Sequence, residues 1–196
     1  MKRILFVLVT GAFLAAATAP SWAKEWQLDM SHSVVKFGVT HIFSTVYGTF
    51  SDYEAEIRFD PERLDQSSFD FTVRVKSINT GVGKRDNHLR SADFFDAAAY
   101  PVMRFQSAKI THKGGKNYVV TGVMTLKKTA VNMDIPFVFH GIAPSPFNKR
   151  QAVAGFDTEF TLDRLAFGVG SGKFYDMGVV GKEVDVTISV EATNGG

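Results

Sequence analysis

Apolar and polar side chains alternate along most of the chain after about residue 25, with the period of two that is typical of strands with one buried face. In the C-terminal segment 183–192, valine, isoleucine and alanine at even positions alternate with charged and hydroxyl side chains at odd positions. The same alternation recurs over 54–59, 69–76 and 156–163, and in weaker form over 33–43, 102–111, 117–127 and 130–141. We therefore predict about eight strands.

Short connections between these segments predict antiparallel neighbours. Turn residues mark them: Asp60-Pro61, the Gly-Gly pair of 113–116, and the proline-rich loop 144–148. A one-sided alternation repeated this often needs two packed sheets or one sheet closed on itself, and closure also removes exposed edges. Pro136 lies inside one strand pattern and indicates an edge, a bulge or a gap in the ladder at that point.

The segment 85–101 is the one helical candidate. Asp86 and Arg90 are four residues apart and could pair on one helical face, Asp93 could cap a second short turn, and Tyr100-Pro101 ends the segment. It lies between the third and fourth predicted strands, where a barrel needs a long connection over one mouth. We therefore predict a short helical lid.

The N-terminus has the pattern of a secretory signal peptide over 1–23: a basic start, an apolar core and a Ser-Trp-Ala cleavage site. The remaining 24–196 has the length of one domain. Loss of Lys2 and Arg3 would leave equal numbers of basic and acidic residues, which argues against a nucleic-acid partner. The chain has no cysteine, so we expect a soluble exported domain that is stable without disulfides.

The predicted interior is rich in aromatic residues, since most of the 18 phenylalanines fall on the inward side of a strand. A packed aromatic core explains this. An eight-stranded barrel can also hold one small ligand, and a lining of Phe and Met would favour a long apolar guest. Composition alone leaves both interpretations open.

Metal binding and catalysis both find little support in the sequence. No pair of the five histidines has the i,i+4 spacing of a helical metal site, so we expect no metal. His41 shares the alternation of Phe37 and Val39, so we expect it to point into the barrel, either as a hydrogen-bonded interior residue or as a contact to a ligand. Arg85, Asp86, His88 and Asp93 are the best catalytic candidates, yet no nucleophile elbow or phosphate loop accompanies them. A local salt-bridge network is the simpler interpretation, and we expect a protein that is not an enzyme.

Three groups of residues resemble the motifs of the YceI-like family, and the resemblance covers 24–192. The first runs from Trp26 through Asp29, His32, Ser33 and Phe37 to His41, followed by Gly48-Thr49-Phe50. The second is RDNHLRSADFFD, which starts at Arg85, with Tyr100-Pro101 and Phe105 after it. The third comprises Asp163-Arg164, Phe167-Gly168-Val169 and Gly181 to Val184.

The resemblance implies an all-β, single eight-stranded antiparallel lipocalin-like barrel, exported to the periplasm. It also implies a bound polyisoprenoid or related amphipathic lipid, such as a quinone or a polyprenyl phosphate, as ligand and no other cofactor. The expected apolar lining is Phe37, Val39, Phe71, Val73, Phe94, Phe95, Phe105, Met124, Phe137, Phe139, Phe156, Phe160 and Phe167. The polar residues expected to meet the head group or fix the lid are His41, Arg85, Asp86, His88, Asp93 and Arg164.

The expected function is therefore that of a lipid carrier, with transient membrane contact and a homodimer as further expectations. Two alternatives remain at this point. One is an enzyme that acts on an isoprenoid lipid with His88 as base. The other is a stress-related interaction protein whose barrel is filled.

Overall fold

The computed structural model describes residues 23–195. Its ten strands form one antiparallel sheet. They are β1 (Glu25–His41), β2 (Ser44–Phe50), β3 (Tyr53–Arg58), β4 (Ser68–Arg74), β5 (Ile78–Asn79), β6 (Val102–Gly114), β7 (Asn117–Leu126), β8 (Thr129–Pro144), β9 (Ala152–Asp163) and β10 (Val180–Asn194). The predicted signal peptide lies outside the described residues, apart from Ala23.

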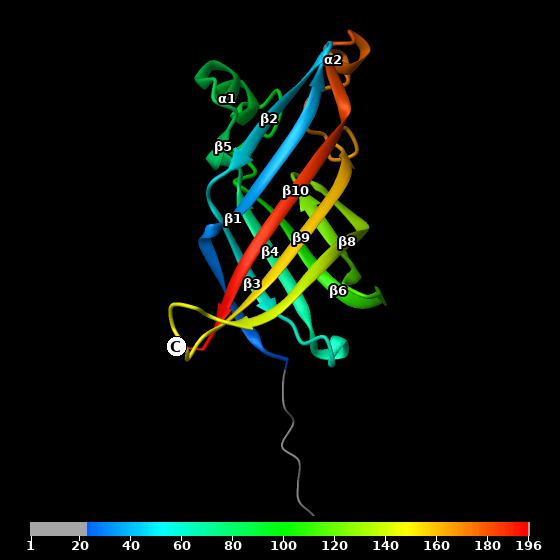
Figure 1. Ribbon diagram of the computed structural model, residues 1–196. Helices are drawn as coiled ribbons and strands as arrows, with labels where there is room; N and C mark the ends of the chain where they lie inside the picture. The colour runs from blue at the N-terminus through cyan, green and yellow to red at the C-terminus, as the bar shows by residue number, and fades with distance from the viewer. Residues whose placement is uncertain (1–22, 196) are drawn as a thin grey trace, which may run out of the picture.

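Strands β10 and β1 pair with each other and close the sheet into an eight-stranded barrel (Figure 1), as the resemblance predicts and as one of the two arrangements that the alternation left open. Val35 lies opposite Ile188 in this closing pair. Strand β1 has two partners on its other edge. Its start pairs with β3, where Trp26 faces Ile57, and its second half pairs with β2, where Phe37 faces Gly48.

The ladder between β8 and β9 covers only part of their length, which confirms the gap that Pro136 indicates. Pairing begins at Val138 and Asp157 and runs from there toward the 145–151 loop. Beyond it, the first part of β8 pairs only with β7, and the last part of β9 pairs only with β10. Pro136 has no N–H to donate, and its carbonyl instead accepts a hydrogen bond of 2.6 Å from the Thr158 hydroxyl.

Two strands, β2 and the two-residue β5, were missed in the sequence, and another was predicted too short. The strand expected over 33–43 is β1, which begins at Glu25, and β2 over 44–50 has no counterpart in the prediction. The two strands are joined by Ile42 and Phe43, and Ile42 has a φ of 54°. Tight hairpins normally place Gly, Asn or Asp at such a position, so an Ile-Phe turn gives no signal in the sequence.

Both α-helices lie at the same end of the barrel (Figure 1). Helix α1 (Gly83–Arg90) lies in the connection between β4 and β6, where the lid is predicted, and short 3-10 turns η1 (Leu64–Gln66) and η2 (Val75–Ser77) flank β4. Helix α2 (Lys173–Asp176) was not predicted, and it lies in the connection from β9 to β10. We call the residues 75–101 and 164–179 the two lid segments.

The opposite end of the barrel is filled with aromatic side chains. Phe59 is completely buried, and its ring contacts five others. These are Phe69, Tyr118, Phe137, Phe139 and Phe156, at centroid distances between 4.9 and 6.0 Å. The barrel therefore has one closed, packed end and one end that only the lid segments cover.

Candidate functional site

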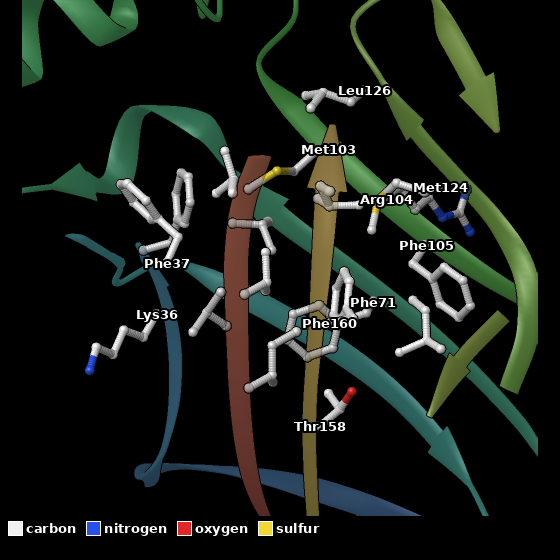
Figure 2. Close-up of a pocket in the computed structure, with 18 of the residues that line it drawn as sticks. Lys36, Phe37, Phe71, Met103, Arg104, Phe105, Met124, Leu126, Thr158 and Phe160 are labelled. Atoms are coloured by element: carbon white, nitrogen blue, oxygen red, sulfur yellow. The ribbon is translucent and has the colours of Figure 1, made fainter. Parts of the chain in front are cut away.

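A cavity of about 240 Å³ lies inside the barrel, between the packed end and the lid segments. Its wall is almost entirely apolar. Phe71 and Phe160 lie on it from different strands, whereas Lys36 and Arg104 turn their charged ends away (Figure 2). Alternation explains this arrangement, because successive side chains of a strand point to opposite faces of the sheet.

Twelve of the thirteen residues expected to line the tunnel contact this cavity. They are Phe37, Val39, Phe71, Val73, Phe94, Phe95, Phe105, Met124, Phe137, Phe156, Phe160 and Phe167. The cavity has further apolar lining that the prediction left out. Val184, Val186 and Ile188 of β10 belong to it, and their inward parity in the C-terminal segment was the signal that could have found them.

Phe139 is the exception. Its side chain is buried and belongs to the packed end, where its ring lies 4.9 Å from that of Phe59 and 5.3 Å from that of Phe156. Parity correctly placed Phe139 inside the barrel. Parity does not specify whether an inward ring lines the cavity or packs against other rings, and Phe139 does the latter.

Two phenylalanines of the first lid segment turn inward from it. Phe94 is buried and stacks on Phe174 of α2 at a centroid distance of 5.5 Å, which joins the two lid segments. Phe95 meets Phe50 of β2 edge to face at 6.1 Å. The aromatic contacts therefore close the cavity at its lid end.

Hydrogen bonds tie helix α1 to the strand next to it. The buried Asp86 accepts from the Thr80 N–H at 2.9 Å and also from the Thr80 hydroxyl, while Arg85 donates to the Thr80 carbonyl at 2.8 Å. Arg90 donates to the Ile78 carbonyl at 2.6 Å. The predicted Asp86–Arg90 pair is therefore wrong, because both groups bond to the chain that precedes the helix.

The other two polar candidates of the lid, His88 and Asp93, also lie away from the cavity. His88 Nε2 lies 2.9 Å from Asp93 Oδ2, and both side chains are exposed. Asp93 does not cap the second turn. The Ser91 carbonyl accepts from the Phe94 N–H there. The expected inward position of His41 is also wrong, since this side chain is exposed at the very end of β1, beyond the cavity.

Arg164 is the one predicted polar residue that borders the cavity. It is buried, and its guanidinium donates to the carbonyls of Gly181, Val169 and Val180 at 2.7, 2.8 and 3.1 Å. Burial lowers the pKa of this guanidinium from its usual value. The bonds to Val180 and Gly181 hold the second lid segment to the start of β10, and the bond to Val169 lies within the lid segment.

One group of side chains within 23–195 has the geometry to hold a metal ion: Asp29, His32 and Glu191. His32 Nδ1 lies 2.9 Å from Asp29 Oδ2 and 3.9 Å from Glu191 Oε1. The hydrogen bond lowers the pKa of Asp29 and raises that of His32. The group joins β1 and β10 and does not line the cavity. Two histidines four residues apart mark a site on one helix, and this pattern cannot reveal a group assembled from two strands.

A closed antiparallel barrel of eight strands with an apolar interior cavity and a helical lid defines a lipocalin-like binding barrel. Between residues 23 and 195, no helix is both long and apolar enough to span a bilayer. The model of the YceI-like domain matches residues 26–192, so the chain belongs to the YceI-like family.

Several relatives extend this result. Protein YceI of Escherichia coli is 31% identical over 97% of both chains, and a UPF0312 protein of Azotobacter vinelandii is 29% identical over the same shares. The crystal structure of BcnA from Burkholderia cenocepacia has a TM-score of 0.75 at 29% identity and covers 84% of this chain and 98% of its own. A polyisoprenoid-binding domain from Saccharophagus degradans has a TM-score of 0.64 at 12% identity, covering 87% and 99% of the two chains, and shows the fold alone.

Proposed function

We propose that this protein binds the chain of a long polyisoprenoid or related amphipathic lipid, such as an isoprenoid quinone or a polyprenyl phosphate, in the barrel cavity. The signal-peptide pattern of residues 1–23 supports a periplasmic location, in which the protein acts as a diffusing lipid carrier. The observation that carries the proposal is the almost wholly apolar wall of a cavity closed by lid segments.

Burial of hydrocarbon supplies the affinity. Each buried methylene is worth about 0.8 kcal/mol, so a guest with roughly ten buried carbons gains about 8 kcal/mol before the cost of ordering it. The side chains that line an empty apolar cavity lack van der Waals contacts on that side. Loading by a flexible apolar chain therefore stabilises both the guest and the barrel.

The alternative functions fit the structure less well. His88 and Asp93, the candidates for a catalytic pair, are exposed on the lid and do not line the cavity, so a lipid chain inside the barrel would not meet them. A completely filled barrel is at odds with the cavity. The shared fold of the polyisoprenoid-binding domain from Saccharophagus degradans supports a polyisoprenoid as the guest.

Native mass spectrometry of the mature protein, purified from its own periplasm, tests the proposal. We expect a stoichiometric adduct that organic extraction identifies as an isoprenoid lipid. The mass of the complex also reports whether the protein is a homodimer. Recovery of apo protein only, which also fails to take up added geranylgeraniol or ubiquinone, would overturn the lipid-carrier proposal.

A further inference from the structure

The cavity accounts for the tail of an amphipathic lipid but not for its head. Its wall offers almost no polar atoms, and the guanidinium of Arg164 already donates to three main-chain carbonyls. A polar head that loses water without gaining hydrogen bonds costs several kcal/mol. If a lipid occupies the cavity, as the proposed function states, its head must lie outside the cavity wall.

A second pocket lies directly outside the lid end of the cavity, and polar groups contribute much of its surface. Neighbouring residues of the chain line the cavity and the pocket. Leu126 and Phe167 line the cavity, whereas Lys127 and Gly168, which follow them directly, line the pocket. The second pocket is therefore separated from the cavity by a single layer of chain.

The wall between the cavity and the second pocket lies where β8 and β9 are not hydrogen-bonded to each other; we call the boundary between these two strands the β8–β9 seam. Lys127 belongs to the turn before β8, and Gly168 follows the end of β9, beyond the point where the two strands stop pairing. No main-chain ladder crosses the seam here. A lipid chain that passes from the cavity to the pocket would have to displace side chains and the Lys127 bond to the Gly168 carbonyl, but no β8–β9 main-chain hydrogen bond.

Lys127 connects the lid segments at this place. Its ammonium donates to the carbonyl of Phe94 at 2.8 Å and to that of Gly168 at 2.7 Å. An ammonium carries three N–H donors, so one remains for a ligand. The side chain is only partly exposed.

The charges that face the pocket favour an anion. Lys127 and Lys173 both line it, and neither forms an ion pair with any residue in 23–195. Asp93 is the one carboxylate among the lining residues, and its Oδ2 is hydrogen-bonded to His88. The Ser171 hydroxyl adds a neutral donor.

We propose that this pocket, with Lys127 and Lys173, is the head-group subsite, and that it takes the phosphate or diphosphate of a polyprenyl chain whose tail fills the cavity. Lysine binds phosphate as a point charge. A neutral head such as a quinone ring would leave both ammonium groups without a counter-charge. The protein therefore selects anionic isoprenoids over neutral ones.

The test compares geranylgeranyl diphosphate with geranylgeraniol, which has the same tail and a neutral head, by calorimetric titration of the lipid-stripped protein. We expect the wild-type protein to bind the diphosphate at least about tenfold more tightly, a factor that corresponds to about 1.4 kcal/mol. Lys173→Gln should remove most of this preference and leave the affinity for the alcohol unchanged. Lys127→Gln should act in the same direction.

Lys149→Gln is the matched control, because Lys149 is an exposed lysine in the loop at the packed end, and this change should leave the preference intact. Equal binding of both lipids, or a preference that survives both pocket variants, overturns the subsite and leaves the lipid-carrier function standing. Failure to bind either lipid overturns the carrier function itself. Inorganic diphosphate that binds as tightly as the lipid diphosphate would mean a site for the free anion, which also overturns the proposal.

Discussion

At the scale of single residues, the size of the inward side chains on β10 keeps the barrel hollow. Val186 lies opposite Phe37 of β1 on one side and opposite Phe160 of β9 on the other, and all three line the cavity. A large residue between two phenylalanines would fill the space that a guest needs. The small β-branched residues of this strand are consistent with selection for an open interior.

Substitution of Val186 with Phe should therefore fill the cavity. We expect at least tenfold weaker binding of an isoprenoid lipid with an unchanged or higher melting temperature, because the added ring enters empty space and gains contacts. Calorimetric titration and thermal unfolding measure the two quantities. Val123→Phe is the control, since Val123 is exposed on β7, and it should leave lipid binding unchanged. Full binding by a folded Val186→Phe protein would place the guest elsewhere.

Asp70 gives a prediction for pH. A hydrogen bond from Arg104 Nε to Asp70 Oδ1 at 2.7 Å, with a further bond from Nη2 to Oδ2, lowers the pKa of Asp70 below its usual 3.8. A carboxyl group with a lowered pKa in the folded state contributes stability above its unfolded-state pKa, and this contribution is lost as the pH falls through the folded pKa.

Asp70→Asn should thus lower the free energy of unfolding at pH 7, and the difference from wild type should shrink below about pH 3. Urea unfolding at a series of pH values measures it. Glu159→Gln serves as a comparison because Glu159 is an exposed acid on β9, a strand that pairs with neither β4 nor β6. A deficit of Asp70→Asn that stays constant into the acid range would contradict the assignment.

The residues of the site were only partly predictable from the sequence. Parity identified the apolar lining because it specifies which face of the sheet a side chain occupies. It failed for His41, which is exposed, and it placed Phe139 inside the barrel without showing that this ring packs against Phe59 instead of lining the cavity. Lys127 and Lys173 were missed because only tertiary structure brings the β7–β8 turn beside α2.

At the scale of elements, the lid depends on a few polar contacts rather than on an apolar helix face. In α1 only Asp86 is buried, so the helix packs little apolar surface of its own. The Thr80 hydroxyl donates to Asp86 and accepts from Arg85 Nε at 2.8 Å. This one hydroxyl therefore links two side chains of the helix to the chain before it.

Thr80→Val keeps the shape of the side chain and removes both bonds. The buried Asp86 carboxylate loses one of its two donors, which should destabilise the lid by about 1–3 kcal/mol. We expect more rapid release of bound lipid in a stopped-flow assay with little change in the unfolding transition of the barrel. Thr125→Val on the exposed face of β7 should match wild type. A release rate equal to that of wild type would show that α1 does not control exit.

The sequence predicts the elements best where the chain is regular. Alternation identified all eight strands of the closed barrel, and Pro136 located the gap between β8 and β9. Strand β2 was missed because an Ile-Phe turn carries no turn signal, and helix α2 because four residues are too few for a helical pattern. These failures cluster at the lid end, where local propensity gives way to tertiary contacts.

At the scale of the whole molecule, the two ends of the barrel differ in how they are held. Five ring contacts around Phe59 and the β8–β9 ladder from Val138 to Pro144 fix the packed end. At the other end the β8–β9 seam is unpaired, and hydrogen bonds from Lys127 and Arg164 with the Phe94–Phe174 stack hold the lid segments in place. Local opening should therefore be much easier at the lid end.

Amide hydrogen exchange followed by mass spectrometry tests this asymmetry. In the lipid-free protein, peptides from 75–101 and 164–179 should exchange more rapidly than those from 54–59 and 152–157, because the lid can open without disturbing the packed end. Bound lipid should slow exchange in both lid segments together, since the guest contacts Phe94 and Phe167 only in the closed state. Protection at the packed end should not change. Uniform protection along the chain would mean that the barrel opens as one unit, and a lid mechanism would then be wrong.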